Sequence, residues 1–570
     1  MSDPFPVFTS RPSSTELVIL LHAFRHTRQN LSSLRSIVLM EMPAADVLVP
    51  DLPLGTFSTA KPSQIVSSLL TQIDELWQQK IEHGDPYRSI TIIGHSMGAL
   101  IGRKLYVCAC GEHKKRAPFE EDIEASHPRP WADCVDRIIL LAGMNRGWEI
   151  NHHLSKFAAI TWTLGVFFGD MFRILRLGDP IIFAIRRGSV FLTELRVQWL
   201  LMRRSADEKC VGKALTIQLL GSIDDMVSPN DNVDLVVGRD FVYLDVPHSG
   251  HENVIEFDDA RYGEGRRKVL LNALKCSEEE LEQKQILPAD TGFGEPDASV
   301  TDVVFVIHGI RDEGYWTHKI ARKIKEKGKL HNRVIATETS SYGYFPIAQF
   351  VFPSERNRKM QWFMDQCVEA MAMYPAADLS FVGHSHGTYL LARALELYTC
   401  CRFQRVVFAG SVVHTRYNWD KRKAKGQIEE VANYVATNDW VVAWFPGTFQ
   451  KLRFQDLGGA GHLGFESPLV QQVTYVQGDH GAAIQEDNWQ AIADFVLGQS
   501  ASSPSPLLKQ RHDWLSMIPG LLIWLVIVLV AFGGALGLTW VLTWQRWEEW
   551  QLTLALTAYI YAVWLFIKKF

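Results

Sequence analysis

The sequence has few cysteines and no cysteine pattern that binds a metal. Eight cysteines are scattered over 570 residues, and only Cys108/Cys110 and Cys400/Cys401 lie close together. No pair has the CxxC spacing of a zinc site, so we expect no metal. Sparse cysteines without a pattern, in a chain of this size, are typical of a reducing compartment.

The chain also lacks an excess of basic charge and an N-terminal signal peptide. Its 58 Lys and Arg are outnumbered by 63 Asp and Glu, which gives a formal net charge of −5. A general nucleic-acid-binding protein normally carries a basic excess, so we expect no nucleic-acid partner. Residues 1–24 have no basic stretch followed by a long apolar core, which argues against a secretory signal. The length predicts two or three domains.

Long apolar runs occur only at the C-terminal end. Residues 514–544 and 551–567 are almost wholly apolar, and about 20 such residues span a bilayer as a helix. Tryptophans at the ends of the runs, and Lys or Arg at their outer flanks, are typical of membrane interfaces. We therefore predict a transmembrane helical hairpin over 513–570. The positive-inside rule then places everything before it in the cytoplasm.

Two polar segments divide the rest of the chain. Residues 276–299 are charged, and residues 498–512 are rich in serine and proline, as flexible linkers are. They leave a first domain over 1–275 and a second over 300–497. Short runs rich in Val and Ile recur in both domains, with helical stretches such as 62–80 between them. This alternation predicts two α/β domains with doubly wound, mostly parallel sheets.

The expected strands are spread along both domains. In the first they are 16–21, 46–50, 89–94, 137–142, 215–221 and 241–246, and in the second 302–309, 333–339, 379–385, 405–410, 431–439 and 473–477.

Each domain carries one G-x-S-x-G pentapeptide directly after an expected strand. The first reads GHSMG around Ser96, and the second reads GHSHG around Ser385. A helical stretch follows each, which is the context of a nucleophile elbow. The glycines allow the tight turn, because a Cβ there would collide with neighbouring backbone. Both serines are candidate nucleophiles, and the alternative is that they only cap helices.

A serine nucleophile needs a base that takes its proton and an acid that orients the base. After a nucleophile elbow both are expected in loops that follow late strands, the acid first. In the first domain, Asp224 is the preferred acid and Asp225 is the fallback. Beyond the next strand, His251 is preferred as the base over His248.

In the second domain, Asp439 ends a strand and is the expected acid. Two histidines follow it. His462 lies in a glycine-rich loop, and His480 lies between the last strand and a closing amphipathic helix. We expect His480 to be the base and His462 to line the pocket.

The oxyanion is expected to be bound by backbone N–H groups, one directly after each nucleophile and one after each domain's first strand. The residues are Phe24 and Met97 in the first domain and Ile310 and His386 in the second. Ala23 stands where the second domain has Gly309, which is tolerable if the φ of Ala23 is negative.

The two domains differ in the distance from serine to acid. It is 128 residues from Ser96 to Asp224 and 54 residues from Ser385 to Asp439. Most of the excess lies in 145–213, which is rich in apolar and aromatic residues and in arginine. An insertion at this point commonly forms a cap over the serine. Its arginines suit an anionic bilayer surface, and a cap packed wholly on its own domain is the alternative.

With these motifs the sequence resembles the α/β-hydrolase superfamily twice, over about 1–275 and about 300–497. The segments LAGMNRGWEI, GSVFLTELRVQWL and GSIDDMVSPNDNVD look like those of lipases and esterases. The resemblance implies hydrolysis of an acyl ester through an acyl-serine, without a metal or organic cofactor. We therefore expect a membrane-anchored serine hydrolase that acts on a lipid or another hydrophobic acyl ester. The alternatives are a thioesterase or peptidase on the same fold, and a sensor or scaffold with one domain as a binding module.

Overall fold

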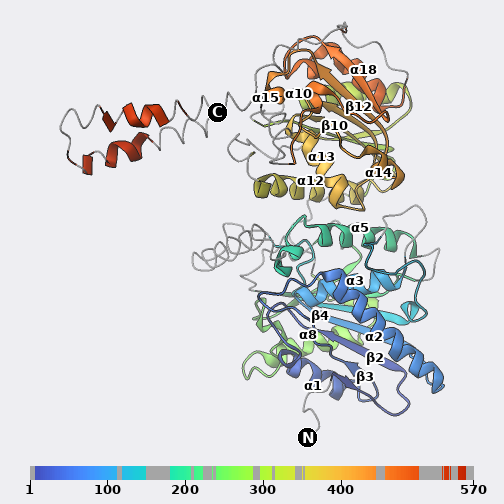
Figure 1. Ribbon diagram of the computed structural model, residues 1–570. Helices are drawn as coiled ribbons and strands as arrows, with labels where there is room; N and C mark the ends of the chain where they lie inside the picture. The colour runs from blue at the N-terminus through green and yellow to red at the C-terminus, as the bar shows by residue number, and fades with distance from the viewer. Residues whose placement is uncertain are drawn as a thin grey trace. The chain divides into compact units, whose positions relative to one another are not determined.

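The computed structural model contains two compact units (Figure 1). Unit 1 comprises Met1–Pro296 together with Met364–Met373 and Tyr398–Cys400, and unit 2 comprises the remaining residues. The structure describes the chain except for residues 1–6, 112–118, 149–179, 207–210, 223–233, 235–238, 287–294, 311–314, 340–349, 351–352, 445–455, 500–506, 508–528, 530–531, 538, 541–547, 549, 552 and 560–570.

Unit 1 is built on a seven-stranded sheet of order β1-β3-β2-β4-β5-β6-β7. Neighbouring strands are parallel except β1 and β3, which are antiparallel. Six strands overlap the six expected ranges, and β1 was missed because two residues show no pattern. The strands are β1 (Phe8–Thr9), β2 (Glu16–Leu21), β3 (Asp46–Leu48), β4 (Ser89–His95), β5 (Val135–Leu141), β6 (Leu215–Gly221) and β7 (Phe241–Val246).

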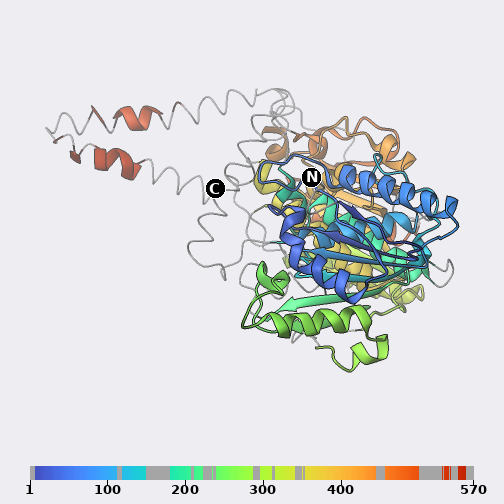
Figure 2. The same cartoon turned by 90° about the horizontal axis from the view of Figure 1, so that it is seen from below.

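Helices cover both faces of this sheet. On one face, α1 (Ser32–Glu41) and α8 (Gly263–Lys275) share a hydrophobic core with the strands, and Figure 2 shows both on the same side of the sheet. α2 (Pro62–Glu82) and α3 (Met97–Ala109) contact each other, and α3 also contacts β4 and β5. Burial on both faces explains why the strands are Val- and Ile-rich without strict alternation. Among the described residues, the other helices are α5 (Val190–Arg204) and α9 (Glu278–Glu282), with 3-10 turns at Arg28–Leu31, Ala132–Cys134, Ile181–Ile185 and Asn253–Ile255.

Unit 2 is built on a six-stranded parallel sheet of order β13-β12-β11-β10-β8-β9. Each strand overlaps one expected range. The strands are β8 (Asp302–Ile307), β9 (Ile335–Glu338), β10 (Asp378–His384), β11 (Phe403–Ala409), β12 (Ile428–Ala436) and β13 (Val470–Val476).

The sheet of unit 2 is also covered on both faces. Val304 and Val306 of β8 pack with α10 (Tyr315–Leu330) and α18 (Glu486–Val496). Phe305 points to the opposite face, because side chains alternate along a strand, and contacts Phe363 of α12 (Pro353–Met373) with ring centroids 5.6 Å apart. The other helices in the described part of unit 2 are α13 (His386–Leu397), α14 (Trp419–Ala424), α15 (Trp440–Trp444) and α17 (Ala460–Leu463), with a 3-10 turn at Ala482–Ile484.

The predicted transmembrane hairpin is wrong. In the part of the chain that the structure describes, no helix is long and apolar enough to cross a membrane. The fold is therefore corrected to α/β with parallel sheets, without the hairpin. The predicted localisation, a two-span membrane protein with both domains cytoplasmic, is not supported.

The described part of the expected cap packs within unit 1. Arg186 lies 5.7 Å from the Trp148 ring, and Arg187 pairs with Asp365. α5 is buried along most of its length and contacts α3. Arg173 and Arg176, which also belong to the expected cap, lie outside the described residues. Both described arginines thus contact protein groups, and whether the cap also faces a bilayer stays a prediction.

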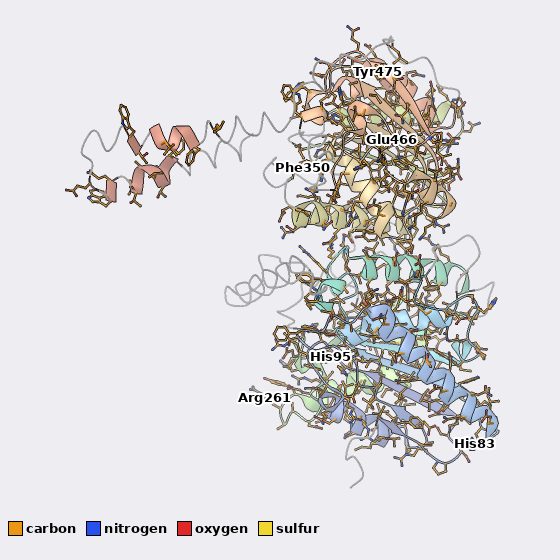
Figure 3. All side chains as sticks on the ribbon, viewed as in Figure 1. His83, His95, Arg261, Phe350, Glu466 and Tyr475 are labelled. Carbon is orange, nitrogen blue, oxygen red and sulfur yellow. The ribbon has the colours of Figure 1, made fainter. Side chains whose placement is uncertain are left out.

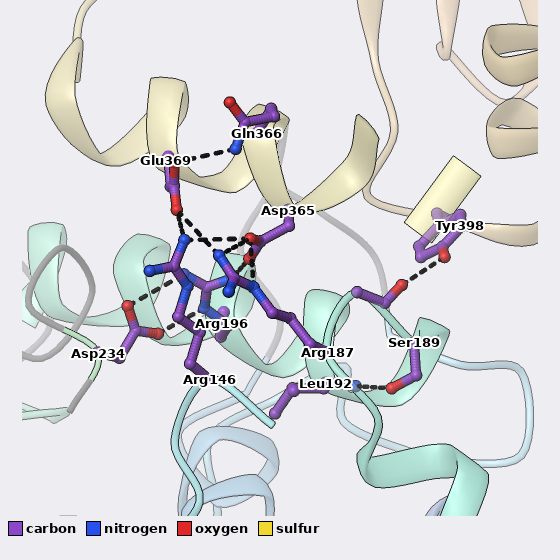
Figure 4. Close-up of polar contacts among 11 residues, drawn as sticks. Arg146, Arg187, Ser189, Leu192, Arg196, Asp234, Asp365, Gln366, Glu369 and Tyr398 are labelled. Carbon is purple, nitrogen blue, oxygen red and sulfur yellow. Dashed lines mark hydrogen bonds and ion pairs between the residues drawn. The ribbon is translucent and has the colours of Figure 1, made fainter. Parts of the chain in front are cut away.

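A buried ion cluster joins α5 to the segment of α12 that belongs to unit 1 (Figure 4). Arg196 donates to Asp234 at 2.5 Å and to Asp365 at 2.6 Å, and all three side chains are at most 2% exposed. Arg146 and Arg187 also pair with Asp365. Burial raises the pKa of Asp365, but the arginines outweigh burial and hold this pKa below its usual value.

Replacing Arg196 with Met should strongly destabilise unit 1, because Asp234 then loses the partner that holds its buried charge. We expect a loss of about 3–5 kcal/mol in the free energy of unfolding, measured by hydrogen exchange of the α5 amides. The control is Lys275→Met, which removes the half-exposed partner of Glu41 and should have little effect on the free energy of unfolding.

The same experiment should depend on pH. The folded-state pKa of Asp365 is lowered, so its contribution is fully present above the unfolded-state pKa and is lost as the pH falls through the folded-state value. The difference between wild type and Arg196→Met should therefore shrink in acid. A loss as small as that of Lys275→Met at neutral pH would contradict this account.

Candidate functional site

Ser96 occupies a strained turn between β4 and α3. Its φ and ψ are 52° and −114°, a backbone conformation that non-glycine residues rarely adopt. A Cβ on Gly94 would lie 2.5 Å from the backbone of Ala99, and one on Gly98 would lie 2.3 Å from the carbonyl oxygen of Leu21. Both glycines are therefore required by close backbone approach, in the strand-turn-helix context that the pentapeptide indicated.

Ser385 occupies the same kind of turn between β10 and α13. Its φ is also 52°, and a Cβ on Gly387 would lie 2.6 Å from the carbonyl oxygen of Ile307. The backbone N–H of Ser385 donates to the last residue of β11, Ala409, at 3.0 Å. Ser96 donates in the same way to the last residue of β5 at 2.9 Å. Each serine thus lies at the carboxyl edge of its sheet.

The structure brings Ser96 and His251 together. The Ser96 Oγ lies 2.7 Å from the His251 Nε2, and both residues are buried. His248 is exposed and stacks on Tyr262 instead, with ring centroids 4.4 Å apart. The expected acid, Asp224, and its fallback, Asp225, lie outside the described residues.

The structure brings Asp439 and His480 together in unit 2. The His480 Nδ1 lies 3.0 Å from both carboxylate oxygens of Asp439, which is fully buried. Burial lowers the pKa of His480, but the charge and hydrogen bond of Asp439 outweigh it, so the pKa is raised. Burial conversely raises the pKa of Asp439, and His480 brings it below its usual value. The backbone N–H of Val442 donates to the same carboxylate at 3.0 Å.

Hydrogen bonds join the loops that carry Asp439 and His480. The Thr437 N–H donates to the carbonyl of Val476 at 2.8 Å, and the Gly478 N–H donates to the Thr437 Oγ1 at 3.1 Å. Asp439 and His480 therefore follow the ends of two adjacent strands, β12 and β13, and hydrogen bonds continue between the two chain segments after the strands end. This arrangement can hold an imidazole in one tautomer, with Nδ1–H toward the carboxylate.

His462 is buried on α17, beside the end of β11. The N–H of the preceding Gly461 donates to the carbonyl of Ser411 at 2.7 Å, and a Cβ on Gly461 would lie 2.5 Å from the Gly410 backbone. Gly410 in turn lies against the ring of His480. His462 is thus placed near the candidate base, and its pocket-lining role remains a prediction.

The four expected oxyanion donors lie among the described residues. Met97 and His386 begin α3 and α13, where backbone N–H groups have no acceptor within the helix. The other pair, Phe24 and Ile310, each lie three residues after the end of a strand, β2 or β8, and two residues after a histidine. The Nδ1 of His22 donates to the carbonyl of the next residue at 3.0 Å, and that of His308 does so at 2.8 Å.

Ala23 is compatible with its turn, since its φ is not positive. Gly309, at the corresponding position of unit 2, is more tightly placed. A Cβ on Gly309 would lie 2.7 Å from the Ser385 Cβ and 3.3 Å from its Oγ. The space next to Ser385 therefore requires glycine at position 309.

The side chain of His386 has a setting that the sequence did not reveal. It is fully buried, stacks on Tyr389 and meets the edge of Phe350, which Figure 3 labels in unit 2. Burial, and then the nearby charge of Arg356, hold the pKa of His386 well below its usual value, so it is neutral. Nothing in the pentapeptide itself signals this environment, because Phe350 and Arg356 come from another segment.

A second feature of both sites, a contact made by the residue before each serine, was not predicted from the sequence. His95 and His384, the residues before the two serines, donate from Nε2 to the backbone carbonyl of His251 at 2.9 Å and of His480 at 3.1 Å. His95 is labelled in Figure 3. The sequence carried a signal for it, because the variable position before serine is histidine in both pentapeptides.

The chain was compared with known proteins. No protein-family model matches the sequence, and no curated protein is significantly similar to it. Among solved structures, esterase B from Lactobacillus rhamnosis has 10% identity and a TM-score of 0.31, covering 50% of this chain and 83% of that one. A carboxylesterase from Nitrososphaera gargenis has 15% identity and a TM-score of 0.27 over 47% and 92%. The lipase BlEst2 from Bacillus licheniformis has 13% and 0.29 over 48% and 52%. At these TM-scores the likenesses assign no activity by themselves.

Replacing Gly410 with Ala should displace the His480 ring. The added Cβ would lie 2.8 Å from the ring Cε1 and 2.9 Å from Nδ1, the atom that faces Asp439. With that contact weakened, burial dominates, and the pKa of His480 should fall below its wild-type value. NMR titration of the histidine rings measures the change.

The matched control is Gly426→Ala. Gly426 also has a positive φ, 65° against 54° for Gly410, but no atom lies within 4 Å of its added Cβ. It should leave the titration of His480 unchanged. If Gly410→Ala also leaves it unchanged, the ring is not held against Gly410 as described.

Proposed function

We propose that both units are α/β-hydrolase domains and that each is a serine ester hydrolase. The observation that carries the proposal is the 2.7 Å approach of the Ser96 Oγ to the His251 Nε2 at a strained strand-turn-helix junction. A helix cap requires neither the strain nor the histidine. Unit 2 adds a second observation: His480 is held by the buried Asp439, in a unit whose Ser385 has the same strained φ as Ser96.

The proposed reaction proceeds through an acyl-serine. The serine Oγ attacks the ester carbonyl carbon while the histidine takes the hydroxyl proton. The oxyanion that forms is stabilised by backbone N–H groups, for which Met97 with Phe24 and His386 with Ile310 are proposed. The histidine gives its proton to the departing alcohol. Water then attacks the acyl group, with the same histidine as base, and the acid is released as the serine regains its proton.

Asp224 is the proposed acid of unit 1, on the basis of strand register. Gly221 pairs with Val246 at the end of β6, as Ala436 pairs with Val476 at the end of β12. The next residue in each case, Ser222 or Thr437, donates its N–H to the same valine carbonyl. Counting two further residues from Thr437 gives Asp439, and counting two from Ser222 gives Asp224. This correspondence favours Asp224 over Asp225.

An apolar acyl group is the proposed substrate feature at the second site. Trp440 follows Asp439 directly and is 42% exposed, and Leu463 follows His462 and is 47% exposed. α15 and α17, which carry these residues, contact each other. Exposed apolar side chains next to the candidate acid and next to His462 suit the acyl chain of a hydrophobic ester.

Ester hydrolysis by single-serine variants tests the proposal. Ser96→Ala and Ser385→Ala should each remove one component of p-nitrophenyl ester hydrolysis, and the double variant should lose all but roughly one part in a thousand or less. If one single variant abolishes all activity in a folded chain, the other unit is a binding module. A fully active double variant would overturn the proposal.

The base of unit 2 can be identified in a Ser96→Ala background. His480→Ala should eliminate turnover, because a triad member is lost. His462→Ala should mainly raise KM, by about 10–100-fold at most. The base must be neutral to accept a proton, and the pKa of His480 is raised, so activity should increase with pH through a value above the usual pKa of histidine. A dead His462→Ala with a nearly normal His480→Ala would assign the base to the other histidine.

A further inference from the structure

We propose that His95 and His384 are positioning residues, each of which holds the loop of the catalytic histidine in its unit. Each donates a hydrogen bond from Nε2 to the backbone carbonyl oxygen of that histidine, His251 or His480. The inference rests on the proposed function, and it adds a role for the residue before each nucleophile.

The same pair of atoms meets in both units. The Nε2-to-oxygen distance is 2.9 Å in unit 1 and 3.1 Å in unit 2. The ring of His95 lies 5.9 Å from that of His251, and the ring of His384 lies 4.7 Å from that of His480. A chance contact would not be expected to recur at the same position of two sites.

The chemistry of the contact fixes the donor. A carbonyl oxygen only accepts hydrogen bonds, so the Nε2 of His95 and of His384 carries the proton. Both side chains are buried, at 1% and 7% exposure. Water therefore does not readily replace the donor, and loss of the donor is costly where the carbonyl is buried, as at His251, which is 7% exposed.

The mechanical role follows from where the two ends of the bond lie. His95 is the last residue of β4 and is paired in the sheet with Leu141, and His384 is the last residue of β10 and is paired with Ala409. The acceptors lie in loops, after β7 and after β13. One rigid strand end thus bears the nucleophile and, on the preceding residue, the donor that holds the base. This couples the serine-to-histidine distance to the strand rather than to the loop alone.

The carboxylate and the new contact act on different parts of the base. Asp439 holds the imidazole of His480 through Nδ1, which sets the tautomer and the direction of the ring. His384 holds the main chain of His480, which fixes the position of the backbone that carries the ring. Misplacing a catalytic group by about 1 Å can cost on the order of 100-fold in turnover.

The test compares phenylalanine with glutamine at each position. His95→Phe, in a Ser385→Ala background, keeps a ring but removes the donor, and kcat should fall about 10–100-fold with KM changed less than about threefold. His95→Gln retains an N–H donor at a similar reach and should restore kcat to within about fivefold of the parent. His384→Phe and His384→Gln, in a Ser96→Ala background, should behave alike. A purely space-filling role predicts the opposite order, with Phe better than Gln, and that result would overturn the proposal.

A second readout does not require activity. Amide hydrogen exchange in the segment 247–257, which carries His251, should accelerate in His95→Phe and not in His95→Gln. Unchanged exchange in His95→Phe, with kcat also unchanged, would overturn the positioning role. A wild-type chain that hydrolyses no ester would overturn the proposed function alone, because the exchange result still decides whether His95 holds this loop.

Discussion

The close approach of three backbone segments at each serine is the constraint on which both candidate sites depend. The helix after the pentapeptide begins against the end of the first long strand, so closely that Gly98 and Gly387 have no room for a Cβ. This contact forces Ser96 and Ser385 to a φ of 52°. Strain of this kind costs about 1–3 kcal/mol, and it persists only where the surroundings impose it. Two well-packed parallel sheets impose it here and leave each serine at a sheet edge.

The two sites share this constraint but differ in what surrounds it. The residue after the nucleophile is Met97 in unit 1 and a buried, neutral His386 in unit 2. At the end of the neighbouring strand, unit 1 has Ala142 with a φ of 46°, whereas unit 2 has Gly410 against the ring of His480. The space beside each base is therefore set by different residues. Different substrate preferences of the two units would follow from these differences.

Features encoded by short sequence segments were predictable, and features that depend on distant segments were not. The buried strands and the serine turns are local, because a run of apolar residues or two flanking glycines determines them. Pairing Asp439 with His480 needed only the order of strands. The setting of His386 and the segment 364–373 of unit 1 depend on contacts across long sequence separations, such as Arg196 with Asp365. The apolar C-terminal runs predicted a hairpin, and among the residues that the structure describes no helix meets the length and hydropathy that a membrane span needs.

Covalent labelling with a fluorophosphonate tests the central claim most directly, since only an activated serine reacts and no substrate need be known. The wild-type chain should gain two labels by intact mass, mapped to the peptides that contain Ser96 and Ser385. Each Ser→Ala variant should gain one label, on the other peptide. A folded wild-type chain that gains no label at either serine would contradict the account.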